Sequence, residues 1–136
     1  MRYHRITRQL RFASAGHNPP LLLRHEELEC QLLDAEGMIL GVSRDVRFEE
    51  KAITLKPLDR ILFYTDGATE AQSAQGDFFG TERLAEAFVA LRKDSAESTL
   101  EKLIEKLRVF RGGGEFQDDI TLAALALMES GEDPPG

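Results

Sequence analysis

One short segment of the chain, residues 61–64, is apolar at every consecutive position, and this feature restricts the fold more than any other. A strand that alternates apolar and polar residues can leave one face in water, whereas a continuously apolar strand has to be covered on both faces. A second apolar segment, residues 120–127, is also predicted to be a strand. The chain is therefore expected to form a layered domain.

The rest of the chain supplies shorter strand patterns and two helix patterns. Together with the apolar segments, strands are predicted at 10–13, 21–24, 29–33, 46–55, 60–65 and 120–127. The alternation in 46–55 changes phase, which predicts a bulge or a hairpin around residues 49–51. Helices are predicted near 81–93 and 98–111, because apolar residues recur there on one helical face. Several strands, two helices and one strand, in that order, indicate the α+β class.

Local signals predict where the second helix begins and ends, and where the ordered chain stops. Ser98 and Glu101 have the spacing of a capping box near the start of the helix. Three consecutive glycines, residues 112–114, are expected to end it. The tail, residues 129–136, is acidic and contains two adjacent prolines, so it is expected to be disordered.

The composition excludes several classes of protein. With 136 residues, 42% of them hydrophobic, the chain can bury the core of one domain. Seventeen Lys and Arg residues against 24 Asp and Glu residues give a net charge of -7, so no nucleic-acid partner is expected. Cys30 is the single cysteine, which excludes an internal disulfide framework and favours the reducing cytoplasm. No apolar run approaches the roughly 20 residues of a membrane span, so no membrane partner is expected either.

Three aspartates stand beside the two apolar strands. Asp66 directly follows the first strand, and Asp118 and Asp119 directly precede the second. If these strands are neighbours in one sheet, the carboxylates meet at one sheet edge, where they could bind a hard divalent cation such as Mg²⁺ or Mn²⁺. The alternative is a solvated loop, because Asp-Gly is a common turn dipeptide and paired aspartates are frequent in loops. The spacing alone favours the loop.

Other catalytic chemistries find less support. A cysteine-dependent phosphatase needs an arginine after its nucleophile, but Glu36 stands six positions beyond Cys30, so Cys30 is interpreted as a small strand hydrophobe. The sequence has no Gly-x-Ser-x-Gly motif, no Gly-Lys-Ser/Thr phosphate loop and no histidine pair with helical zinc-site spacing. His17 lies in a rigid loop that ends in Pro19 and Pro20. Its ring could face a ligand, but a hydrogen bond to the backbone is the simpler interpretation.

Four segments of the chain form a recognisable set. They are residues 13–22 (Ala-Ser-Ala-Gly-His-Asn-Pro-Pro-Leu-Leu), 63–71 (Phe-Tyr-Thr-Asp-Gly-Ala-Thr-Glu-Ala), 79–84 (Phe-Gly-Thr-Glu-Arg-Leu) and 117–122 (Gln-Asp-Asp-Ile-Thr-Leu). In this order, with a helix pair between the last two, they resemble the bacterial PPM-type serine/threonine phosphatases of the stage II sporulation protein E (SpoIIE) and RsbU kind. The resemblance spans about residues 3–128.

The resemblance implies a fold of two packed antiparallel sheets flanked by helices. The early part of the family's domain carries Gly-Asp-x-x-Asp and Asp-x-Ser-Gly-His-Gly segments, and neither occurs in this chain. Residues 1–128 are therefore expected to be the C-terminal portion of such a domain: a partial PPM-type β-sandwich with a flanking pair of α-helices, lacking the N-terminal strands and helices. We expect such a piece to form a homodimer, to pair with a missing segment or to be only marginally stable.

The resemblance also implies a dinuclear Mn²⁺ or Mg²⁺ site, of which this chain carries half. Asp66 and Asp118 match the family's two later metal-binding aspartates, and Asp119 is expected to be a weaker ligand or to support one. His17 and Asn18 are expected at the edge of the site. No residue of the chain is assigned as a nucleophile, because metal-bound water would attack the phosphorus atom in this family.

The implied activity is hydrolysis of phosphoserine or phosphothreonine on a regulatory protein, such as an anti-sigma-factor antagonist, in the cytoplasm. The alternative is a catalytically inactive, phosphatase-like protein-interaction module, since the early metal-binding segments are absent. The chain by itself is expected to be inactive or weakly active. At Leu58 the sequence departs from the family's usual Pro-Gly-Asp turn, and a change of turn type is expected because a left-handed backbone disfavours leucine.

Overall fold

The computed structural model describes residues 1–35 and 48–129. Its elements, in chain order, are β1 (Arg2–His4), β2 (Gln9–Phe12), β3 (Leu21–Leu23), β4 (Cys30–Leu32), β5 (Lys51–Thr54), β6 (Arg60–Tyr64), α1 (Asp66–Thr69), α2 (Gly80–Ala90), α3 (Ala96–Phe110) and β7 (Leu122–Ala126). None of the described helices is long and apolar enough to cross a membrane.

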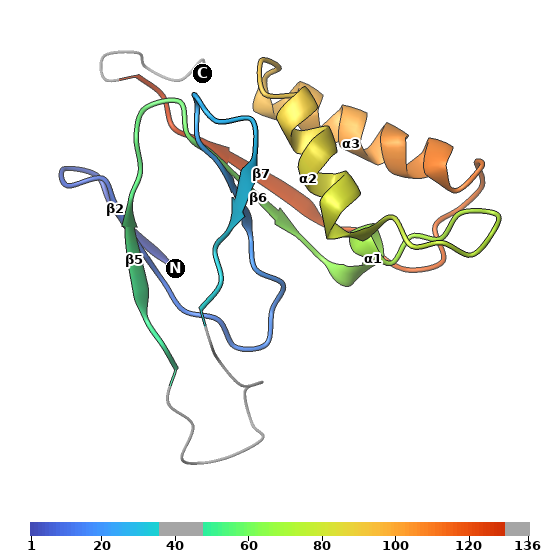
Figure 1. Ribbon diagram of the computed structural model, residues 1–136, viewed down its shortest axis with the longest axis horizontal. Coiled ribbons are helices and arrows are strands. Elements are labelled where there is room, and N and C mark those ends of the chain that lie inside the picture. The colour runs from blue at the N-terminus through green and yellow to red at the C-terminus, as the bar shows by residue number, and fades with distance from the viewer. Residues whose placement is uncertain (36–47, 130–136) are drawn as a thin grey trace.

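The strands form two antiparallel sheets in separate layers. One sheet has the order β1-β2-β5, and the other has the order β4-β3-β6-β7. Helices α2 and α3 lie together on one side of the sheet that contains β6 and β7, while β2 and β5 lie on its other side (Figure 1). The layers are therefore a helix pair, a four-stranded sheet and a three-stranded sheet, which confirms the α+β class and the partial sandwich.

Strand β6 is the centre of the fold because its two faces contribute to two different cores. Leu62 and Tyr64 pack into the core beneath the helices, and Ile61 packs into the core between the sheets. Burial of such a side chain stabilises the folded state by about 1.5–3 kcal/mol. The largest helix residues in the first core are Leu84, Phe88, Leu103 and Leu107. The prediction that residues 61–64 are covered on both faces is confirmed.

Several elements differ from the sequence predictions. The patterns did not indicate β1 or α1, which have three and four residues and are too short to produce a periodic signal. Strand β5 begins only at Lys51, so the expected strand 46–55 is shorter, and residues 48–50 lead into it without strand structure. Positions 46 and 47 of that prediction, and the predicted tail from residue 130 onward, lie outside the described residues.

The start of α3 also differs from the prediction. Its N-cap residue is Ser95, whose hydroxyl oxygen accepts a hydrogen bond from the Ser98 backbone N–H at 3.1 Å. Ser98 therefore lies inside the first turn, and the expected capping box of Ser98 and Glu101 does not begin the helix. The predicted range 98–111 begins two residues late, because the first large apolar residue of the helical face, Leu100, lies one turn into the helix.

Leu58 keeps a left-handed backbone, with φ of 67°, so the expected change of turn type is wrong. The turn is closed by the Asp59 N–H, which donates to the Lys56 carbonyl oxygen at 3.2 Å. The Leu58 N–H donates to the Leu127 carbonyl oxygen at 2.9 Å, just beyond β7. These bonds hold a conformation that is unfavourable for leucine by about 1–2 kcal/mol.

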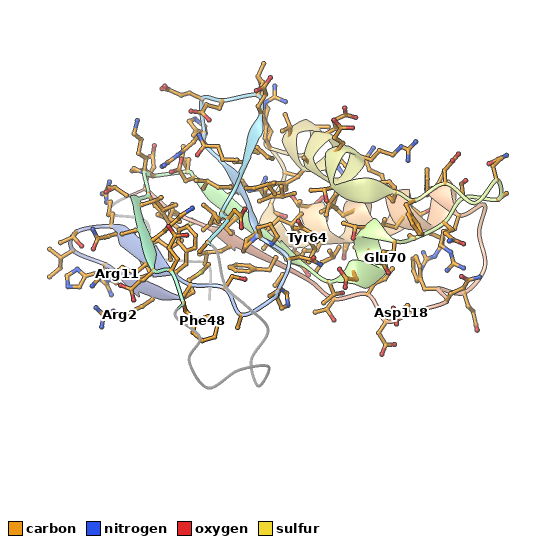
Figure 2. All side chains as sticks on the ribbon, turned by 60° about the horizontal axis from the view of Figure 1, so that its bottom comes forward. Arg2, Arg11, Phe48, Tyr64, Glu70 and Asp118 are labelled. Atoms are coloured by element: carbon orange, nitrogen blue, oxygen red, sulfur yellow. The ribbon has the colours of Figure 1, made fainter. Side chains whose placement is uncertain are left out.

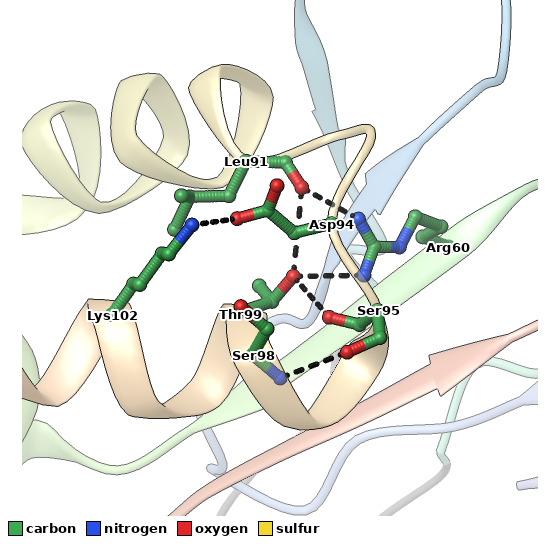
Figure 3. A network of polar contacts seen from close by, with 7 residues as sticks. All are labelled: Arg60, Leu91, Asp94, Ser95, Ser98, Thr99 and Lys102. Atoms are coloured by element: carbon green, nitrogen blue, oxygen red, sulfur yellow. Dashed lines mark hydrogen bonds and ion pairs between the residues drawn. The ribbon is translucent and has the colours of Figure 1, made fainter.

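Arg60, the first residue of β6, is buried under the connection between α2 and α3 (Figure 3). Its guanidinium donates to the Leu91 carbonyl oxygen and to the Thr99 hydroxyl, each at 2.9 Å, and lies 5.6 Å from the centroid of the Phe88 ring. Burial lowers the pKa of Arg60, and the Asp94 carboxylate opposes that shift. Arg60 therefore ties the start of β6 to both helices, and the strand leads from this anchor toward Asp66.

Candidate functional site

The pairing of β6 with β7 brings Asp66 and Asp118 to the same sheet edge. The two strands are antiparallel, with Tyr64 opposite Leu122 at the end of the ladder. The contact continues past the strands, where the Thr65 N–H donates to the Thr121 carbonyl oxygen at 3.2 Å. The condition stated from the sequence, that the two strands are neighbours in one sheet, is therefore met. Asp66 leaves this edge into α1, and Asp118 stands on the segment that enters β7.

Gly67 allows the two segments to approach closely. A Cβ atom built at this position would lie 2.1 Å from the Asp119 carbonyl oxygen, which is far inside van der Waals contact. Asp66 and Gly67 form the Asp-Gly dipeptide that is common in turns, but Asp66–Thr69 is a short helix, and Gly67 is not among the residues with positive φ. The absence of a side chain at Gly67, rather than an unusual backbone angle, is what the site requires.

Asn18 reaches Asp66 from the loop between β2 and β3. Its side-chain Nδ2 donates to the Asp66 Oδ1 at 2.7 Å. This bond orients one carboxylate oxygen of Asp66 and leaves the other available to a cation. The sequence placed Asn18 at the edge of the site, and the structure brings it into direct contact with an expected ligand.

His17 faces its own loop instead. Its Nδ1 lies 3.3 Å from the Asn18 carbonyl oxygen, a hydrogen bond in the tautomer that carries the proton on Nδ1. The Ser14 hydroxyl donates to the His17 carbonyl oxygen at 3.3 Å. The simpler sequence interpretation, a loop histidine bonded to the backbone, matches this geometry. No described contact joins the His17 side chain to Asp66 or Asp118.

Asp118 and Asp119 are both exposed at the start of the last strand. The Asp119 backbone N–H donates to the Asp118 Oδ1 at 2.8 Å, so the neighbouring residue orients the expected ligand through its main chain. Figure 2 shows Asp118 and Glu70 at the same end of the molecule, away from Arg2 and Arg11. The site edge therefore carries several carboxylates and is open to solvent.

Tyr64 lies beneath this edge and responds to it electrostatically. Burial raises the pKa of the Tyr64 hydroxyl, and the negative charge of Asp66 raises the pKa further. A hydrogen bond with the Thr81 side chain acts in the opposite direction. The Tyr64 hydroxyl is therefore a neutral group at pH 7.

The donor chemistry of this edge suits a hard cation, but the number of donors is small. Carboxylate and amide oxygens are the ligands that Mg²⁺ and Mn²⁺ prefer. Within residues 1–35 and 48–129, no group of three His, Cys, Asp or Glu side chains is placed to hold a metal ion. Asp66 and Asp118 would supply only part of a ligand set, and the remaining ligands would have to be water, substrate oxygens or residues beyond the described ones.

Cys30 does not take part in this site. Its thiol lies in β4 and donates a weak hydrogen bond to the Ala85 carbonyl oxygen of α2 at 3.8 Å. Burial raises the pKa of the Cys30 thiol to about 11, so almost no thiolate is present at pH 7. This environment agrees with the interpretation of Cys30 as a small hydrophobe rather than a nucleophile.

A cleft of about 260 Å³ opens beside Asp118 and Gly67, the residue that follows Asp66. Its walls come from α1, from the loop between α1 and α2, and from the segment between α3 and β7. The lining residues that bear on its chemistry are Gly67, Glu70, Phe78, Arg111, Phe116 and Asp118. The sequence analysis did not single out Arg111. An arginine between a helix and a glycine run has no distinctive local pattern, and only the fold shows that it lines the same cleft as Asp118.

Two packed antiparallel sheets with a helix pair on one face are a fold that this chain shares with solved phosphatase domains. The phosphatase domain of the cell fate determinant SpoIIE from Bacillus subtilis, presoaked in Mn, superposes with a TM-score of 0.73 and 14% identity, over 96% of this chain and 56% of that chain. The SiaA-PP2C domain of Pseudomonas aeruginosa also gives a TM-score of 0.73, with 23% identity over 90% of this chain and 48% of that chain.

The sequence comparison identifies the family. The family model for stage II sporulation protein E (SpoIIE) matches residues 1–127, and the chain belongs to this family. Protein IcfG of Synechocystis sp. is 31% identical over 117 residues, which are 85% of this chain and 18% of that protein. The phosphoserine phosphatase RsbU of Bacillus subtilis is 28% identical over 125 residues, which are 90% of this chain and 36% of that protein. The chain therefore spans only a minor part of either relative.

Proposed function

We propose that this chain contributes two metal-ligating carboxylates, Asp66 and Asp118, to a metal-dependent protein serine/threonine phosphatase. The observation that carries the proposal is the placement of both aspartates at one sheet edge, with Asn18 donating to Asp66 at 2.7 Å. Membership of the SpoIIE family and the similarity to RsbU, a phosphoserine phosphatase, support the reaction class.

The residues of the chain have distinct roles in this proposal. Asn18 fixes the rotamer of Asp66, and the Asp119 N–H fixes that of Asp118, so both carboxylates are oriented before a cation arrives. Asp119 itself is exposed and follows Asp118 directly, so it is assigned the role of a weaker ligand in this proposal. Bound Mn²⁺ or Mg²⁺ would supply an acidified water and neutralise charge on the phosphoryl group. The chain supplies no thiolate nucleophile, since Cys30 is protonated and lies in β4.

The proposed substrate is a phosphorylated regulatory protein of the anti-sigma-factor antagonist type, acted on in the cytoplasm. The similarity to RsbU supports this substrate class. An exposed site edge also suits a protein substrate, because a phosphorylated side chain on a folded partner can reach carboxylates at the surface but could not enter a closed cavity.

A second candidate function is a catalytically inactive interaction module. It is favoured by the small number of ligands, since no three metal-ligating side chains gather within the described part of the chain. Under this proposal Asp66 and Asp118 would be polar surface residues, and the domain would bind a partner without hydrolysing it.

Hydrolysis of a phosphoserine peptide separates the two functions. We would measure Mn²⁺-dependent phosphate release by the full-length gene product and by the 136-residue chain, each beside Asp66→Asn and Glu101→Gln variants. Glu101 is exposed on α3, in the half of the helix nearest Arg60, and serves as the charge-matched control. The enzyme proposal expects activity that is lost in Asp66→Asn and kept in Glu101→Gln. Equal phosphate release by wild type and Asp66→Asn in the full-length protein would overturn it and favour the interaction module.

A further inference from the structure

Arg111 has an unmet hydrogen-bonding capacity. It caps the C-terminal end of α3, and its side chain is half-buried beside the cleft. Its Nη1 is closed to solvent and has no hydrogen-bond partner in the described part of the chain. A buried guanidinium N–H without an acceptor is unfavourable, and such groups in native proteins are usually explained by a ligand, an ion or a water.

Phe116 holds this guanidinium in place. The Arg111 Cζ lies 5.2 Å from the centroid of the Phe116 ring, within the range of a cation–π contact. Stacking on an aromatic ring restricts the rotamers of the arginine while leaving its N–H edges free. A guanidinium fixed in this way can present two parallel donors to the oxygens of a carboxylate or a phosphoryl group.

The cleft limits what such a ligand can be. Its volume of about 260 Å³ lies just below the range of pockets that enclose drug-sized molecules or cofactors, so it suits a single side chain. Phe78, which is 55% exposed, provides an apolar wall. Glu70 and Asp118 also face the cleft, and their negative charges would weaken anion binding unless a cation offsets them.

We propose that Arg111 and this cleft form an oxyanion subsite for the peptide substrate, which makes Arg111 a specificity-determining residue. The inference rests on the proposed function, because it assigns a substrate group to the same site edge. The oxyanion is either the phosphoryl group itself or a carboxylate side chain near it in the substrate sequence. Arg111 binds one of these from the wall of the cleft, and its side chain moves on binding so that the buried Nη1 reaches the acceptor that it lacks.

Binding measurements without turnover test this subsite. We would titrate the full 136-residue chain, without metal and with Mg²⁺, with inorganic phosphate and with three peptides: phosphoserine with neutral flanks, serine with acidic flanks, and phosphoserine with acidic flanks. Calorimetry and backbone amide shifts would report affinity. We expect Arg111→Met to weaken binding about tenfold or more, and Arg111→Lys to weaken it less, since lysine keeps the charge but loses the planar fork. Mg²⁺ should strengthen binding by offsetting the carboxylates.

Arg108→Met is the matched control. Arg108 lies one turn earlier on α3, is exposed and pairs with Glu105 at 3.0 Å, so its loss removes the same charge without touching the cleft. The peptide that loses most affinity in Arg111→Met shows which oxyanion the subsite binds. Wild-type affinity in a folded Arg111→Met variant, or an equal loss in Arg108→Met, would overturn the inference.

The same experiments distinguish the subsite from the proposed function. A chain that binds the peptide through Arg111 while its full-length protein shows no Asp66-dependent hydrolysis would support the subsite and refute the phosphatase. Hydrolysis that depends on Asp66, with peptide affinity and KM unchanged in Arg111→Met, would support the phosphatase and refute the subsite. Thermal unfolding of each variant checks that the domain remains folded.

Discussion

Polar side chains at the two ends of β6 differ in burial and in hydrogen bonding. At its start, Arg60 is buried, and its donors are taken up by the Leu91 carbonyl and the Thr99 hydroxyl. Beyond its end, Asp66 is exposed, and its carboxylate accepts a hydrogen bond from Asn18. We call the start of β6, at Arg60, its closed end, and the region beyond its last residue, at Asp66, its open end. Polar groups at the closed end stabilise the fold, whereas the carboxylates at the open end are available to bind a ligand.

Two arginines show the same contrast. Arg60 and Arg111 each stack on a phenylalanine ring, at 5.6 Å and 5.2 Å from the ring centroid. Arg60 makes hydrogen bonds to both helices, whereas the Arg111 Nη1 makes none within the described residues. Polar groups that the fold has already satisfied act as structural anchors. Those that it leaves unsatisfied beside a cleft indicate where a ligand binds.

The largest expected effect is at the closed end. Arg60→Met should lower the free energy of unfolding by about 2–4 kcal/mol, because it removes two charge-assisted hydrogen bonds and leaves the buried Leu91 carbonyl without this donor. Urea unfolding followed by circular dichroism would measure the change. Arg111→Met should lower stability by less than about 1 kcal/mol, since the side chain has fewer partners to lose.

Arg108→Met provides the baseline for both variants. Its exposed pair with Glu105 should contribute no more than about 0.5 kcal/mol. Equal destabilisation by Arg60→Met and Arg111→Met would remove the distinction between the two arginines and make Arg111 a structural residue.

The sequence was informative where a residue's neighbours follow from strand order. Continuous apolar residues placed β6 between two cores, and the positions of Asp66 and Asp118 predicted their common edge once β6 and β7 paired. Arg111 and Arg60 could not be distinguished in this way. Both are single arginines next to helix or strand ends, and their surroundings depend on contacts with segments that lie far away in the sequence.

Backbone details were predicted less well for a related reason. Propensity argued against a left-handed Leu58, but hydrogen bonds to Lys56 and Leu127 hold it there. Similarly, the Asp66-Gly67 dipeptide was interpreted as a common turn sequence, whereas the importance of Gly67 lies in the approach of the Asp119 carbonyl. Tertiary contacts determine the backbone conformation at Leu58 and the need for glycine at position 67. A local sequence pattern does not reveal such contacts.

A smaller effect is expected at the open end, from Gly67→Ala. The new methyl group would overlap the Asp119 carbonyl oxygen, which belongs to the backbone and cannot rotate away. We expect a loss of about 1–3 kcal/mol in stability and a displacement of Asp66 from Asp118. Urea unfolding and the backbone amide shifts of residues 65–67 and 118–121 would report the two effects.

Gly113→Ala is the control for this substitution. Gly113 has φ of 88° and no atoms near the position of a new Cβ, so alanine there adds backbone strain of about 1 kcal/mol without a clash. Amide shifts near Asp66 and Asp118 should change only in Gly67→Ala. If Gly67→Ala were as stable as wild type, the close approach of α1 to the Asp118 segment would be refuted.

The smallest expected effect is a gain in stability at the closed end, from Leu58→Gly. The Lys56–Asp59 turn is held by the buried Asp59 carboxylate, which accepts from the Lys56 N–H at 2.8 Å and from Arg24 at 2.6 Å. Glycine adopts the left-handed conformation without steric strain, although it also increases the entropy of the unfolded chain. Relief of strain of about 1–2 kcal/mol should exceed this entropic term and leave a net gain of about 0.5–1 kcal/mol. Leu58 is 36% exposed, so the loss of its partly buried side chain opposes this gain. A decrease in stability on urea unfolding would show that leucine packing outweighs backbone strain, and that the closed end of β6 is not strained by this turn.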